Sequence, residues 1–72
     1  MSVQNNRIKT KLRSRWIKKL ATLPETGMGY QVVNIYLKNG DIQKEVLVVS
    51  PYIFLPRGVN QKDFIDIRLS EK

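Results

Sequence analysis

The chain has 72 residues, which is the length of one small domain. It contains neither cysteine nor histidine, so disulfides, the usual zinc ligands, cysteine nucleophiles and histidine general bases are all excluded. A chain this short buries only about 60% of the surface that its unfolded form exposes. We therefore expect tight packing or self-association to complete a marginal core, and we expect no cofactor.

The positive charge is concentrated in the first third of the chain. Residues 23–72 hold six basic and six acidic residues, which cancel, so the whole net charge of +7 lies before residue 23. Segregated charge of this kind is typical of proteins that bind a polyanion, and nucleic acid is the first candidate. The alternative is a solvated tail that only keeps the protein in solution. The candidate nucleic-acid-binding residues are the seven bases of this segment: Arg7, Lys9, Lys11, Arg13, Arg15, Lys18 and Lys19.

Residues 1–13 are interpreted as a flexible basic N-terminal arm, although their pattern leaves alternatives open. From Arg7 to Trp16, basic residues alternate with other residues, which is typical of a strand carrying a comb of cations on one face. Wound as a helix, the same segment aligns Ile8, Leu12 and Trp16 along one stripe. Strand, helix and disorder therefore all remain open for residues 7–13.

A short helix is predicted over residues 14–22, with Ser14 as its N-cap. Trp16, Ile17 and Leu20 form its apolar face, and Pro24 ends the element because proline disfavours helical geometry in the residue before it. The single tryptophan has two possible roles, sealing the core or stacking on a nucleic-acid base.

A β-hairpin is predicted from two β-rich runs, 30–38 and 41–49, which flank Asn39-Gly40. This dipeptide favours a two-residue type I′ turn, which would place Leu37 opposite Ile42 on an inward-facing apolar side. Away from the turn, a second apolar patch arises on the other side from Val32 opposite Leu47 and Tyr30 opposite Val49. The helix, a curled sheet or another copy of the chain could cover that patch.

Two further strands are predicted, at residues 52–55 and 63–69, the latter with Ile65, Ile67 and Leu69 facing inward. Residues 14–72 would thus form a single small domain. The predicted fold class is mostly β or small α+β: an N-terminal helix, then an antiparallel meander of about four strands. Such a meander can also curl into a small SH3-like or Sm-like barrel.

Residues 33–42, with the core Leu37-Lys38-Asn39-Gly40-Asp41, resemble the first motif of Sm-like RNA-binding proteins. Arg57-Gly58 is similar to the Arg-Gly of that family's second motif. The resemblance covers about ten residues and that dipeptide, and implies a bent five-stranded barrel after an N-terminal helix. It is used as an analogy of shape, and no binding residue is transferred.

The expected function is non-catalytic binding. The six carboxylates are scattered singly and the chain has no glycine-rich phosphate loop, so we predict that it is not an enzyme. Nucleic acid, either RNA or DNA with low sequence specificity, is the first expected partner. The alternative is a protein-interaction or self-assembling module, and attachment to a membrane surface ranks last. No apolar run approaches a membrane span, and the absence of cysteine fits a cytoplasmic location.

Overall fold

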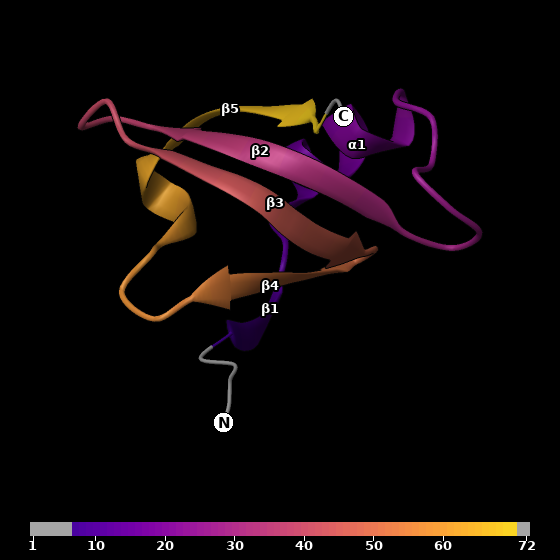
Figure 1. Ribbon diagram of the computed structural model, residues 1–72, viewed down its shortest axis with the longest axis horizontal. Helices are drawn as coiled ribbons and strands as arrows, with labels where there is room; N and C mark the ends of the chain where they lie inside the picture. The colour runs from indigo at the N-terminus through magenta and orange to yellow at the C-terminus, as the bar shows by residue number, and fades with distance from the viewer. Residues whose placement is uncertain (1–6, 71–72) are drawn as a thin grey trace.

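The computed structural model describes residues 7–70, which form one antiparallel five-stranded sheet and one short helix (Figure 1). Residues 1–6 of the predicted arm, and residues 71 and 72, lie outside the described part. The prediction of a mostly β fold is confirmed. The elements in chain order are β1 (Arg7–Lys11), α1 (Ser14–Ala21), β2 (Gln31–Leu37), β3 (Ile42–Val49), β4 (Tyr52–Pro56), the 3₁₀ turn η1 (Gln61–Asp63) and β5 (Phe64–Leu69).

The strands follow the order β1-β4-β3-β2-β5 across the sheet. Of the four strands predicted as a meander, β2, β3 and β4 pair in succession, whereas the fourth, β5, pairs with the free side of β2 instead of with β4. β1 and β5 are therefore the two edges of the sheet. Because no pairing joins these edges within residues 7–70, the sheet is not closed, and the predicted barrel is not confirmed.

A fifth strand, β1, arises from the segment that the sequence leaves ambiguous. Residues 7–11 pair with β4 from Arg7 opposite Pro56 to Lys11 opposite Tyr52, so this part of the predicted arm belongs to the sheet. The next residue, Leu12, is buried, and its backbone N–H donates to the carbonyl of Pro51 at 2.8 Å. The helix is accordingly the second element of the fold rather than the first.

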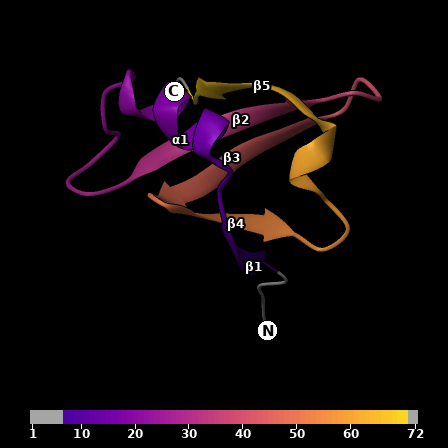
Figure 2. The same ribbon diagram turned by 180° about the vertical axis from the view of Figure 1, so that it is seen from behind.

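Helix α1 ends at Ala21, one residue before the predicted end, and packs on one face of the sheet (Figure 2). Its N-cap is Arg13 rather than Ser14, because the carbonyl of Arg13 accepts the first helical bonds, and no side chain caps this end. Trp16 and Leu20 point into the core, as their spacing predicts. Within residues 7–70, no helix is long and apolar enough to cross a membrane.

The core lies between α1 and the sheet face that it covers. Alternate residues of each strand point to this face, as the pleat requires. The opposite face, which we call the outer face, is not covered by α1. The buried apolar residues are Leu12, Trp16, Leu20, Val33, Ile35, Leu37, Val46, Val48, Ile53, Leu55, Phe64 and Ile67.

The predicted hairpin is present, but its turn is one residue longer than predicted. The N–H of Gly40 donates to the carbonyl of Leu37, and the N–H of Leu37 donates to the carbonyl of Asp41. Gly40 has a φ of 94°, so the loop is a three-residue turn that ends in a left-handed glycine. The pairing beside the turn is therefore shifted by one residue, and Ile42, predicted to face inward, pairs with Tyr36 and is 43% exposed.

A β-bulge at Glu45 restores the predicted register further along. Glu45 has a φ of 55°, and its N–H donates to Oδ1 of Asn34 at 3.0 Å. Beyond the bulge, Val33 lies opposite Val46 and Val32 opposite Leu47, as predicted. The extra residue in β3 thus compensates for the longer turn and keeps Val33 and Val46 in the core.

A second irregularity alters the start of β5. The register shifts between Tyr36 and Leu37, so that Leu37 lies opposite Phe64. Phe64 is buried, whereas Ile65, which was predicted to face inward, is 60% exposed. Ile67 is buried in the core as predicted.

Candidate nucleic-acid interface

Three of the predicted cations stand in one row on β1. Arg7, Lys9 and Lys11 alternate along the strand and are all exposed. Their intervening residues, Ile8 and Thr10, pair with the buried Leu55 and Ile53, so the three cations point to the outer face. Two residues of strand rise separate the Cα atoms of successive cations by about 6.7 Å.

A row of aromatic side chains lies beside these cations on β4. Tyr52 is the register partner of Lys11, and Phe54 is the partner of Lys9. Both rings are half-buried and share the outer face, because the alternating residues Ile53 and Leu55 point into the core. The two strands therefore pair cation with ring twice in succession.

Direct contacts join the two rows. The ammonium of Lys9 lies 4.5 Å from the centre of the Tyr52 ring, which is a cation–π contact. Nη1 of Arg7 donates to the backbone carbonyl of Phe54 at 3.4 Å. Neither contact neutralises a charge, and within residues 7–70 no carboxylate forms an ion pair with Arg7, Lys9 or Lys11.

The outer face continues from the rings into an apolar region on β3 and β2. Val49 is the register partner of Tyr52, and Leu47 lies two residues away on the same side. Their exposed fractions are 41% and 38%, and Tyr30 before β2 is 40% exposed. The predicted second apolar patch is thus uncovered by the helix. We call the residues Arg7, Lys9, Lys11, Leu47, Val49, Tyr52 and Phe54 the cation–aromatic face.

The remaining predicted cations lie on or beside α1, on the other side of the sheet. Arg13 caps the helix, and Arg15 and Lys18 are exposed on its surface. The guanidinium of Arg15 lies 4.7 Å from the centre of the Trp16 ring. Because α1 covers the face opposite to the cation–aromatic face, the seven predicted bases do not form one continuous patch.

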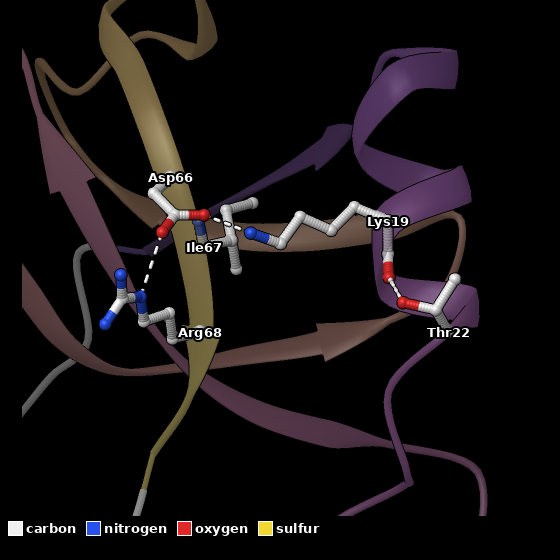
Figure 3. A network of polar contacts seen from close by, with 5 residues as sticks. All are labelled: Lys19, Thr22, Asp66, Ile67 and Arg68. Carbon is white, nitrogen blue, oxygen red and sulfur yellow. Dashed lines mark hydrogen bonds and ion pairs between the residues drawn. The ribbon is translucent and has the colours of Figure 1, made fainter.

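Lys19 forms an ion pair with a carboxylate that it shares with Arg68. Its ammonium contacts Oδ1 of Asp66 on β5, and Nε of Arg68 contacts the other carboxylate oxygen at 2.9 Å (Figure 3). The hydrogen bond from Lys19, and then the one from Arg68, lower the pKa of Asp66 from 3.8 to about 2. The same carboxylate raises the pKa of Arg68. This network ties α1 to the β5 edge, and it gives Lys19 a carboxylate partner that Arg7, Lys9 and Lys11 lack within residues 7–70.

Gln61 of η1 holds the junction between β1 and α1, a role that the sequence does not predict. Its Nε2 donates to the carbonyl of Lys11, and its Oε1 accepts from the N–H of Arg13, both at 2.8 Å. The side chain bridges two backbone groups where the chain leaves the strand. Gln61 lies about 50 residues from both positions, so no local pattern could identify this contact.

Trp16 is unavailable for stacking on a ligand. The side chain is 4% exposed and lies with its ring centre 5.8 Å from that of Phe64, at an interplanar angle of 60°. This contact anchors α1 to the start of β5. Of the two roles that the sequence allows for Trp16, the structure places it in the core.

The chain matches no protein-family model, and no curated protein or solved structure is similar enough to match it. The short resemblance of residues 33–42 to Sm-like proteins therefore gains no support beyond those residues. Among the described residues, no cluster of three or more acidic side chains has the arrangement of a metal site.

Proposed function

We propose that this protein is a non-catalytic nucleic-acid-binding protein that contacts its ligand through the cation–aromatic face. The observation that supports this most directly is the row formed by Arg7, Lys9 and Lys11, exposed and without an ion pair to any carboxylate within residues 7–70. Lysine and arginine side chains in such a row neutralise phosphates and release counterions. The spacing of about 6.7 Å is comparable to the separation of successive phosphates in an extended strand.

A non-catalytic role agrees with the chemistry of Asp66, the described carboxylate whose pKa is shifted. Asp66 is held by Lys19 and Arg68, which lower its pKa to about 2. A carboxyl group with such a pKa is a poor general acid or base near neutral pH. A cytoplasmic location, in which nucleic acid is accessible, is part of the same proposal and fits a chain without cysteine.

The salt dependence of binding tests how many cations take part. Three neutralised phosphates predict a log–log slope of about −2 on a single strand and about −3 on a duplex, whereas all seven bases would give about −6 on a duplex. A fluorescently labelled oligonucleotide, titrated by anisotropy at several salt concentrations, measures this slope. We expect the shallower slope, because the structure places the helix cations on the other side of the sheet.

A pair of matched variants separates the cation–aromatic face from the general charge of the chain. K9Q/K11Q removes two cations from the face, and K38Q/K62Q removes two exposed cations from the hairpin turn and η1. We expect K9Q/K11Q to reduce the slope on a single strand from about −2 to about −1, and K38Q/K62Q to leave it unchanged. Equal losses in both variants, or no binding by the wild type at about 50 mM salt, would contradict the proposal.

A second candidate function, self-assembly or binding of a protein partner, is favoured by the apolar part of the outer face. Tyr30, Leu47 and Val49 each expose about two fifths of their surface and are not covered by α1, although the ring of Tyr30 lies against Gly27. Light scattering over a range of protein concentrations tests the self-assembly version. It predicts a mass that rises with concentration in the wild type and stays at one chain in L47D. A wild type that remains a single chain throughout would eliminate self-assembly.

A further inference from the structure

We infer that the ligand is a single-stranded nucleic acid whose bases stack on Tyr52 and Phe54 while its phosphates lie along β1. This inference rests on the proposed function. It adds that the ligand is single-stranded, and it names the side chains on which the bases stack. The observation that carries it is the register between two neighbouring strands, which repeats one cation and one ring twice. A nucleotide of a single strand likewise repeats one phosphate and one base.

The dimensions of the two rows agree with this assignment. Lys11 and Lys9 are two residues apart on β1, and Tyr52 and Phe54 are two residues apart on β4, so both rows advance by the same strand rise. A backbone that follows the cations therefore brings successive bases over successive rings. In a duplex the bases are paired and stacked on each other, so their flat faces are not available to the rings.

The Tyr52 ring carries a cation that a stacked base would replace. The ammonium of Lys9 lies over the ring at 4.5 Å, on a flexible side chain that is exposed to solvent. An exposed cation–π contact is weaker than the stacking of a base on an aromatic ring. Release of Lys9 from the ring also frees its charge to meet a phosphate, so the exchange improves both interactions.

The surface beyond the rings fits a flat apolar ligand and offers little basis for reading sequence. Val49, the register partner of Tyr52, continues the surface toward Leu47, and neither side chain carries a hydrogen-bonding group. Every base has a π-face, so stacking on Tyr52 and Phe54 tolerates any sequence. We therefore expect binding with low sequence preference.

The test compares three probes that share phosphates but differ in their bases. They are an oligothymidine of about 12 nucleotides, an abasic strand of the same length, and the oligothymidine annealed to its complement, all titrated at about 50 mM salt. We expect the wild type to bind the oligothymidine at least about tenfold more tightly than either of the other probes.

The variant Y52L/F54L should lower affinity for the oligothymidine by about tenfold and leave affinity for the abasic strand unchanged. Its control is Y36L, which removes a half-buried ring of β2 that Arg68 covers at 5.5 Å. Circular dichroism establishes that each variant is folded. In proton NMR spectra of the wild type, the resonances of the Tyr52 and Phe54 ring protons should shift upfield on addition of oligothymidine. This readout requires no substitution.

The possible failures are distinguishable. Equal affinity of the wild type for all three probes, or an unchanged preference in a folded Y52L/F54L, would overturn the stacking inference and leave phosphate binding by the cations intact. Absence of binding to every probe would contradict the proposed function itself. Ring protons that do not shift in the presence of saturating oligothymidine would likewise overturn the inference.

Discussion

Nε2 of Gln31 lies 3.1 Å from the backbone carbonyl oxygen of Leu20, so the first residue of β2 donates a hydrogen bond to the last turn of α1. The same amide lies 3.2 Å from the carbonyls of Leu23 and Pro24. Gln31 is 7% exposed and is the only polar residue within residues 7–70 that is buried. It therefore supplies a second donor to the carbonyl of Leu20, which also accepts from the N–H of Leu23, and a donor to the two carbonyls that follow the helix.

Replacement of Gln31 should be strongly destabilising. Q31L keeps a similar volume but removes the donor to the carbonyls of Leu23 and Pro24 and leaves the carbonyl of Leu20 with only the N–H of Leu23. This loss should cost about 2 kcal/mol of unfolding free energy. Q31E should cost about 3 kcal/mol, because a carboxylate would face the same three oxygens. Urea unfolding measures both. The control is Q43L, at a half-buried position of β3, with an expected change below about 0.5 kcal/mol. A loss in Q31L no larger than in Q43L would contradict the capping role.

The Asp66 network predicts a specific acid response. Because the folded-state pKa of Asp66 is about 2, below its ordinary value of 3.8, its contribution to stability is present above pH 3.8 and is lost as the pH falls toward 2. Since Lys19 and Arg68 are partly exposed, D66N should remove only about 1 kcal/mol at neutral pH. Unfolding free energies measured between neutral and acid pH should converge for wild type and D66N at the acid end. The control D63N changes a carboxylate that forms no ion pair with a described cation; if it flattened the acid response as much as D66N does, the assignment to Asp66 would be wrong.

The bulge at Glu45 depends on Asn34. N34A removes the oxygen that accepts from the N–H of Glu45 and should cost about 1 kcal/mol, whereas N34D retains an acceptor and should cost less. Amide hydrogen exchange provides a local readout, since the Glu45 N–H should lose protection in N34A. Equal protection of that N–H in N34A and the wild type would show that another group holds the bulge.

The fluorescence of Trp16 should report folding and not ligand binding. Trp16 is the only tryptophan, is 4% exposed and lies on α1, away from the outer face. We expect a marked red shift of its emission on unfolding in urea and no quenching by a saturating oligonucleotide. Strong quenching without unfolding would place the ligand beside α1 and would favour the helix cations over those of β1.

Local pattern was sufficient to predict α1 and the strands β2 to β5, but not β1 or every register. The spacing of Trp16 and Leu20 identifies the buried side of α1, because a helix places such residues on one stripe. Asn39-Gly40 correctly predicts a hairpin, yet the loop includes one more residue, which leaves Ile42 exposed. The bulge at Glu45 restores the predicted register only beyond that point. Turn type and bulge compensate for one another, so neither follows from local preference alone.

The candidate interface, too, is predicted only in part by local pattern. The alternation of Arg7, Lys9 and Lys11 is visible in the sequence and is equally compatible with several conformations. Pairing with β4, more than forty residues away, selects the strand and brings Tyr52 and Phe54 beside the cations. The same tertiary structure pairs Lys19 with Asp66, and it buries Trp16, so that its ring cannot stack on a ligand.

By itself, the amino-acid sequence determined the class of fold, the segregation of charge and the chemistries that are unavailable, because these depend on composition and on short-range periodicity. Only the tertiary structure decided which cations share a surface and which aromatic rings lie beside them. These are contacts between residues far apart in the chain, and they are set by strand pairing and by packing of α1 on one face of the sheet. The division of the seven bases between two sides of that sheet is the physical result on which the proposed binding mode depends.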